Sequence, residues 1–400
     1  MVTAPVIDPS VLAEDLAELV QIPSVTGQER AALAWLARRA QELGLEAELV
    51  EHDLTALRAH PDHPGEEAPR AELHTLSVTL RGALPERLCL CGHVDVVGAG
   101  HERWRHGPWS GAIADGCVHG RGSVDMKGGV IAALHALAAL RAAGAPTPEI
   151  VLQCVPSEED GGLGALAALE RDSRFDGCVI PEPTGFTVVC AQAGALTFRG
   201  TVRGRGAHAA MRLEGRSAID RYVAVHAALA AHERRINADV GHPAMRALEL
   251  PYPISVGRVE AGEWSSSVPD RLVFEGRVGV PVGEEPAAAR VALEAAVHMA
   301  DDEQPLVEIA WTGGAFAPGE TDPGHPWVAR VRDAVRAERG GDAPMAGVPW
   351  GADMRLYTAR GIPAVMVGTT GIELAHAVDE RVRIDEVAAV ARIIARVVAG

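Results

Sequence analysis

The sequence lacks the features that mark several common classes of protein. It has 37 Lys and Arg against 54 Asp and Glu, a net charge of −17, so it has no excess of positive charge for binding nucleic acid or an anionic membrane. We find no internal repeat and no apolar run long enough to span a bilayer. G-x-G-x-x-G after a strand, Walker A, G-x-S-x-G and H-E-x-x-H motifs are all missing, which argues against dehydrogenases, P-loop NTPases, serine hydrolases and one class of zinc peptidase.

Cysteine usage and the first residues both indicate a reducing cytoplasm. The six cysteines form no C-x-x-C pair, and several lie in strand-like runs, where a free thiol behaves as a small buried hydrophobe. The segment after Met1 soon reaches Asp8 and Glu14 and has neither a basic nor an apolar region of the secretory type. We therefore predict a cytoplasmic protein that binds a small molecule, and neither nucleic acid nor a membrane.

The order of predicted elements indicates an α/β protein with an insertion. Four hundred residues suffice for one large domain and a smaller one. Over residues 1–191 and 314–400, nearly continuous apolar strands alternate with helices, which predicts a mostly parallel sheet covered on both faces. Residues 192–313 show a β-α-β-β-α-β order, which suits an inserted two-layer α+β module of the ferredoxin-like kind.

Two local patterns lead to specific expectations. Thr26 and Glu29 have the spacing of a capping box, which predicts a helix immediately after them. His60 and His63 lie in a segment, 53–70, that is rich in proline and charge. We interpret this segment as a surface loop, although a separate metal site there is an alternative.

Five acidic or His side chains follow predicted strands or a glycine-flanked turn. In open α/β sheets, ligands bind beyond the carboxyl ends of the strands. Taken singly, each residue has an ordinary structural explanation, such as a helix start, a turn or a surface His. Two His and three carboxylates together suit Zn²⁺, with Co²⁺ or Mn²⁺ as alternatives. The five are His93, Asp125, Glu159, Glu182 and His376.

The motifs around these residues resemble the signatures of the M20 metallopeptidases across nearly the whole chain. They are Gly92-His93-Val94-Asp95-Val96, Gly120-Arg121-Gly122-x-x-Asp125-Met126-Lys127-Gly128, Ser157-Glu158-Glu159, Glu182-Pro183 and His376. That family includes acetylornithine deacetylase, succinyl-diaminopimelate desuccinylase, aminoacylase and glutamate carboxypeptidase. The resemblance implies a dizinc-exopeptidase-like catalytic domain in which Asp125 bridges two zinc ions, His93 and Glu182 complete one site, and Glu159 and His376 complete the other.

The resemblance also implies a reaction. Asp95 would orient His93, and Glu158 would act as general base while a metal-bridging water attacks an amide carbonyl. The expected activity is removal of an acyl group from an N-acyl amino acid or a related acyl-amine, of the acetylornithine deacetylase type. A dipeptidase or carboxypeptidase acting on small peptides is the alternative. A non-catalytic binding homologue is a third possibility, against which the complete set of ligands and base argues.

The inserted module carries a further motif. Gly204-Arg205-Gly206-Ala207-His208 resembles the family's dimerisation motif, which implies a homodimer in which His208 reaches the partner's site and stabilises the oxyanion; a turn His is the alternative. The family often has Ser-x-Pro after this His, where this chain runs on through Ala209 and Ala210 to Arg212. Ser267 stands where many members have Asn before Val-Pro. Arg212 and Ser267 are therefore candidate substrate contacts, and both departures weaken the transfer of any specific substrate.

Arg355 is the last candidate for binding substrate. Gly351-Ala352-Asp353-Met354-Arg355 resembles the family segment whose Arg binds the substrate carboxylate. The planar guanidinium fork suits that task because it binds a carboxylate through two hydrogen bonds. Pairing of Arg355 with Asp353 or with other acids is the alternative.

Overall fold

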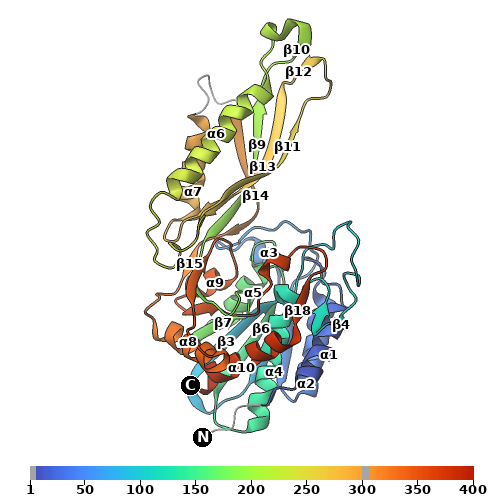
Figure 1. The fold of residues 1–400 in the computed structure, drawn as a ribbon, viewed down its shortest axis with the longest axis vertical. Helices are drawn as coiled ribbons and strands as arrows, with labels where there is room; N and C mark the ends of the chain where they lie inside the picture. Colours follow the sequence, from blue (N-terminus) through green and yellow to red (C-terminus); the bar gives the residue numbers. More distant parts are fainter. Residues whose placement is uncertain (1–5, 300–306) are drawn as a thin grey trace. The chain divides into compact units, whose positions relative to one another are not determined.

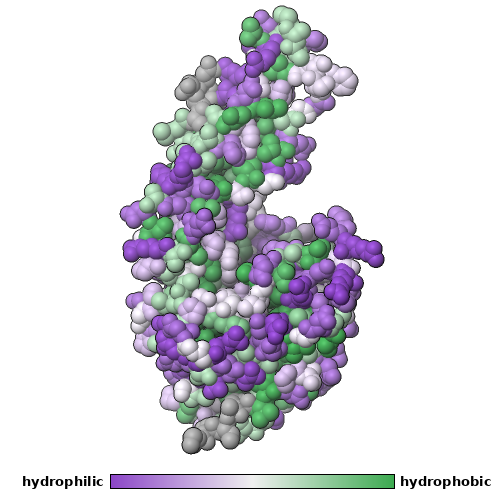
Figure 2. All heavy atoms as spheres, viewed as in Figure 1, coloured by the Kyte–Doolittle hydropathy of each residue, from purple (hydrophilic) through white to green (hydrophobic). Residues whose placement is uncertain are grey.

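The chain folds into two compact units in a computed structural model that describes residues 6–299 and 307–400 (Figure 1). Unit 1 comprises Met1–Cys190, Glu320–Ala346 and Ala352–Gly400, and unit 2 comprises Ala191–Gly319 and Gly347–Gly351. Unit 2 is thus inserted into the sequence of unit 1. Hydrophilic and apolar side chains are interspersed over the visible face of each unit (Figure 2).

The largest sheet lies mainly in unit 1 and, in the described part of the chain, has nine strands in the order β1-β2-β6-β3-β7-β17-β8-β15, with β16 paired to β8. Its centre, β6-β3-β7-β17, is parallel, whereas β1 pairs antiparallel with β2, β2 with β6, and β8 with β17. This confirms the predicted α/β class with a parallel core. The strands are β1 Glu46–Glu51, β2 His74–Leu80, β3 Leu84–His93, β6 Pro148–Val155, β7 Gly177–Ile180, β8 Val188–Gln192, β15 Gly319–Glu320, β16 Met345–Val348 and β17 Ala364–Met366.

Helices cover this sheet because its central strands are apolar on both faces. Helix α4 packs against α1, α10 and strand β6, while α5 also contacts β6 and packs with α9. Since β6 is buried almost throughout, it is covered from both sides. The helices of unit 1 are α1 Pro9–Val20, α2 Arg30–Glu42, α3 Leu54–Arg58, α4 Gly128–Ala143, α5 Leu163–Arg171, α8 Pro326–Arg339, α9 Met354–Thr358 and α10 Ile384–Ala399.

One apolar segment is longer than the sequence analysis allowed. Ser123–Ala143 has the length and hydropathy of a helix that could cross a membrane, and in this respect our expectation was wrong. However, 83% of its apolar window is buried inside the structure. Such burial is typical of the core helix of a folded domain, so the segment is weak evidence for a membrane span.

Unit 2 is a two-layer α+β module, as predicted. In its sheet the strands run β11-β13-β9-β14, all antiparallel, and α6 and α7 pack on it around a core that includes Phe198 and Phe274. The chain order β9-α6-β11-β13-α7-β14 is the split β-α-β arrangement of ferredoxin-like folds. The bounds are β9 Gly194–Arg203, α6 Ala218–Ile236, β11 Ile254–Ala261, β13 Arg271–Val280, α7 Pro286–His298 and β14 Val307–Phe316.

Two small sheets complete the described structure. In unit 1, β18 (Arg381–Arg383) pairs with β5 (Cys117–His119), which pairs with β4 (Ala112–Ala114). In unit 2, β10 (Ala207–His208) pairs with β12 (Ser267–Val268). The first of these sheets brings residues near position 380 beside the turn that leads into α4, and it was not predicted.

The capping box predicted for α2 is wrong, although the helix itself is present. Glu29 makes no capping bond with its side chain to α2, and its Oε1 accepts the N–H of Gly27 at 2.7 Å. The Thr26 hydroxyl donates instead to Asp95 Oδ2 at 3.2 Å. The Thr26 hydroxyl is thus used in a tertiary hydrogen bond to Asp95, a residue of the site described next, and not in a helix cap.

Candidate metal centre

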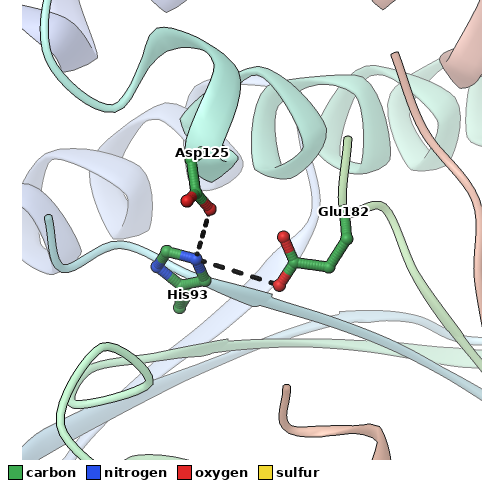
Figure 3. A group of neighbouring side chains, drawn as sticks. All are labelled: His93, Asp125 and Glu182. Carbon is green, nitrogen blue, oxygen red and sulfur yellow. Dashed lines mark hydrogen bonds and ion pairs between the residues drawn. The ribbon is translucent and has the colours of Figure 1, made fainter. Parts of the chain in front are cut away.

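Three side chains from different elements of unit 1 meet beyond the ends of β3 and β7 (Figure 3). His93 is the last residue of β3, Glu182 lies two residues after β7, and Asp125 lies in the turn Ser123–Lys127 that leads into α4. His93 Nε2 is 3.1 Å from Asp125 Oδ1 and 3.9 Å from Glu182 Oε1. One donor atom from each residue lies within 4.8 Å of the other two, so the three can surround one cation.

A second group of three shares Asp125 with the first. His376 Nε2 is 3.4 Å from Asp125 Oδ2 and 3.1 Å from Glu159 Oε2. The donor atoms of these residues again lie within 4.8 Å of one another. The two carboxylate oxygens of Asp125 therefore face two different imidazoles, which is the arrangement that a carboxylate shared between two cations requires. The five residues predicted as ligands are brought together.

The two groups differ in burial. His93 and Glu182 are buried, with side chains 1% and 5% exposed, whereas the side chain of His376 is 54% exposed. Burial raises the pKa of Glu182 to about 8, with nearby Asp125 adding to the effect and His93 opposing it. Burial also acts to raise the pKa of Asp125, but hydrogen bonds from His376 and His93 outweigh it and lower that pKa. Asp125 is thus the group held ionised between the two imidazoles.

Asp95 contacts both His93, the residue that we expected it to orient, and the turn that carries Glu158 and Glu159. The acceptor for His93 Nδ1 is the main-chain carbonyl of Asp95, at 2.9 Å, while its carboxylate Oδ1 is 3.6 Å away. Because a carbonyl only accepts, Nδ1 carries the proton in this contact and Nε2 is left facing Asp125. The carboxylate accepts the main-chain N–H groups of Glu158 and Glu159, each at 3.1 Å. Asp95 therefore fixes His93 through its carbonyl and the Glu158–Glu159 turn through its carboxylate.

Glu158, the predicted base, is buried on the same turn as Glu159. Burial raises the pKa of Glu158 well above its ordinary value, and the negative charges of Asp353 and Glu182 add to this, while His93 opposes it. A carboxylate with a raised pKa holds a proton more readily near neutral pH, which suits a group that accepts and then returns one.

Three predicted site residues belong to unit 2 and to neither of the two groups of potential metal ligands. His208, Arg212 and Ser267 are exposed at or beside the β10–β12 pair. His208 Nδ1 accepts the N–H of Ala210 at 3.1 Å, and Arg212 Nη2 donates to Asp220 at 2.9 Å. The local fold thus gives His208 and Arg212 ordinary surface partners.

Arg355 is buried in unit 1, with 3% of the residue exposed. Its Nη1 donates to the carbonyl of Ala352 at 2.9 Å, and its Nη2 donates to the carbonyl of Gly161. A substrate carboxylate would have to compete with these main-chain bonds. The geometry favours a structural role for Arg355 over the substrate contact that we predicted.

The loop with His60 and His63 holds no cluster of potential ligands among the residues that the structure describes. His60 Nε2 lies 3.5 Å from Glu170, and His63 Nε2 lies 3.4 Å from Glu66, so each imidazole faces a single acid. These contacts agree with the interpretation of a surface loop.

Sequence reasoning missed two residues beside the centre, Arg121 and Glu380. Both are buried, and Arg121 Nη1 donates to Glu380 Oε2 at 2.7 Å. Arg121 stands inside a motif quoted above, which was the available signal. Glu380 follows His376 by four residues in a polar loop, and no local pattern connects it to a residue 259 positions away.

Comparisons with known proteins agree with this geometry. Residues 89–400 match the model of peptidase family M20/M25/M40. Succinyl-diaminopimelate desuccinylase of Methylobacterium radiotolerans is 30% identical over 405 residues, covering 96% of this chain and 95% of the relative. The enzyme of the same name from Alkalilimnicola ehrlichii is 28% identical, covering 94% of this chain and 95% of the relative.

Solved structures share the fold at low sequence identity. The M20 family metallo-carboxypeptidase Sso-CP2 from Sulfolobus solfataricus superposes with a TM-score of 0.76 at 17% identity, covering 97% of each chain. Aminopeptidase PepT from Bacillus cereus gives 0.74 at 20% identity over 98% of each chain. The Bacillus subtilis YXEP protein, described as a dinuclear metal binding peptidase of the M20 family, gives 0.64 at 16% identity over 97% of each. The chain belongs to peptidase family M20/M25/M40 and is a metal-dependent hydrolase of amide bonds.

Proposed function

We propose that each of the two groups of ligands holds one divalent cation, with zinc as the expected metal. We also propose that the protein removes the acyl group from an N-acyl amino acid. The observation that carries this proposal is the placement of Asp125, whose two carboxylate oxygens face His93 and His376 separately. Two imidazoles and three carboxylates are a donor set that suits zinc.

The residues divide the chemistry between them. Divalent cations held here supply Lewis acidity for an amide carbonyl and for a water molecule. Glu158 takes the proton of that water as it attacks the carbonyl carbon, and returns the proton to the leaving amine nitrogen when the C–N bond breaks. Asp95 keeps Glu158 and Glu159 on one turn through their main-chain N–H groups, so that base and ligand stay adjacent.

A hydrolysis assay tests the proposed substrate class. Purified protein would be given N-succinyl-diaminopimelate, N-acetylornithine, other N-acyl amino acids and dipeptides, with and without a chelator. We expect release of the free amine from an acyl amino acid, loss of activity with the chelator and recovery with Zn²⁺, Co²⁺ or Mn²⁺. Hydrolysis of dipeptides alone would overturn the deacylase proposal and leave a peptidase of the same family.

We also propose a cytoplasmic homodimer in which His208 contributes to the partner's site. The support is that His208 is exposed on unit 2, and that the described cysteines are all buried and free, as suits a reducing compartment. Sedimentation of the purified protein and the kinetics of His208→Ala test this. A monomer with full activity in the variant would contradict it.

A further inference from the structure

Glu380 is buried beside the turn that carries Asp125. It is 1% exposed, and its Oε1 accepts the main-chain N–H groups of Val124 at 2.9 Å and of Asp125 at 3.3 Å. The main-chain carbonyl of Glu380 accepts the N–H of Gly120 at 2.9 Å. Glu380 thus fixes the backbone on which the shared carboxylate stands.

Arg121 extends the same contacts to the second imidazole. It is 3% exposed; its Nη1 donates to Glu380 Oε2 at 2.7 Å, and its Nη2 donates to the main-chain carbonyl of His376 at 3.1 Å. The guanidinium also lies 5.1 Å from the centre of the Trp104 ring, which covers it. One ion pair therefore connects the backbone at Asp125 to the backbone at His376.

His376 needs such support more than the other ligands do. It belongs to neither helix nor strand, its φ of +61° is in the left-handed region, and its side chain is half exposed. A buried ion pair is costly unless hydrogen bonds satisfy both partners, and here the bonds go to the segments that carry two ligands.

We propose that Arg121 and Glu380 are positioning residues for the group Asp125/Glu159/His376, and that the affinity of this group for its cation depends on their ion pair. The inference rests on the proposed function, in that it takes both groups to hold cations. His93 and Glu182 stand at the ends of β3 and β7 and make no hydrogen bond with the pair, so their group depends on it only through Asp125.

Competition between the metal-free full-length protein and a chromophoric chelator for Zn²⁺ tests the inference. His376→Ala and His93→Ala assign the two binding steps to the two groups. In Glu380→Gln we expect the step assigned to His376 to weaken by about 10- to 100-fold, and the other by about threefold or less. Arg121→Lys keeps the charge but loses the fork that reaches His376, so we expect the same selective weakening, and it serves if Glu380→Gln does not fold.

Asp15→Asn is the matched control. Asp15 is a buried carboxylate that accepts from Arg39 at 2.8 Å, lies 2.7 Å from His135 Nε2, and belongs to neither group. We expect this variant to lower the melting temperature while both binding steps keep their wild-type affinities.

The outcomes separate the inference from the proposed function. Unchanged affinities in Glu380→Gln and Arg121→Lys, or equal weakening of both steps, would overturn the positioning role and leave the hydrolase proposal intact. Wild-type protein that binds two ions but hydrolyses no acyl amino acid would overturn the substrate proposal and leave the positioning role. Fewer than two ions in the wild type would overturn both.

Discussion

The two donor groups of unit 1 share Asp125 but are held in different ways. His93 and Glu182 extend from adjacent parallel strands and are buried, so the sheet itself fixes them. Glu159 and His376 stand on a turn and a loop, and His376 is half exposed. Ligands next to parallel strands are thus positioned by the pairing of the strands. Ligands on a turn or a loop need further hydrogen bonds to their backbone.

Close packing also positions the group His93/Asp125/Glu182. Gly129 lies in the first turn of α4, and a Cβ there would collide with the carbonyl of Pro181, the residue before Glu182. Because glycine leaves that space free, the start of α4 and the end of β7 come into contact. The turn with Asp125 precedes α4 directly, so Asp125 and Glu182 are set by one packing arrangement.

The largest expected effects come from two single variants, each of which removes the imidazole of one group. His93→Ala deletes the strand-held ligand, and we expect loss of the cation from that group and a fall in kcat/KM of about 10³-fold or more, since cation stabilisation of developing charge amounts to several kcal/mol. His376→Ala should lose the other cation with a smaller fall, because the loop group is more open to water. Metal content and kinetics of both variants measure this, with His63→Ala as the control. A larger effect from His376→Ala than from His93→Ala would reverse the comparison.

The base is expected to be separable from both groups. In Glu158→Ala, kcat should fall by about 10²- to 10⁴-fold while two cations per chain remain bound, because Glu158 serves proton transfer and not ligation. Metal analysis beside steady-state kinetics checks it. Retained turnover would show that another group is the base.

Asp95→Asn should weaken cation binding at the group that contains Glu159 and leave binding at the group that contains His93 nearly unchanged. The substitution keeps the carbonyl that accepts from His93, but its amide nitrogen would face a main-chain N–H of Glu158 or Glu159. We expect about 10-fold weaker Zn²⁺ binding at the group that contains Glu159, and little change at the other, by chelator competition. Equal weakening of both groups would indicate that the carboxylate orients His93 after all.

The smallest effect lies outside the centre and depends on pH. Burial acts to raise the pKa of Asp15, but hydrogen bonds from His135 and Arg39 outweigh it and lower that pKa. A depressed carboxyl pKa stabilises the fold above the unfolded value of about 3.9, and this contribution is lost as the pH falls through the folded pKa. Asp15→Asn should therefore destabilise the protein by about 1–3 kcal/mol at pH 7. The difference in melting temperature from wild type should narrow toward pH 3, and a constant difference would contradict the assignment.

The sequence predicted the positions of His93 and Glu182 more directly than those of Glu159 and His376. His93 and Glu182 follow apolar strands, and the carboxyl ends of parallel strands meet at one edge of a sheet, so their meeting follows from the pattern. His376 was placed by its motif and by the predicted strand before it, but its left-handed backbone and its bond from the distant Arg121 could not be read from that pattern. Asp95 was expected to orient His93, but spacing alone could not tell whether its carbonyl or its carboxylate would make the contact.

The central claim is that two cations lie on either side of Asp125. Anomalous diffraction from crystals of the protein grown with Zn²⁺ tests it most directly. We predict two peaks, one among His93, Asp125 and Glu182 and one among Asp125, Glu159 and His376. A single peak, or peaks away from Asp125, would contradict the account.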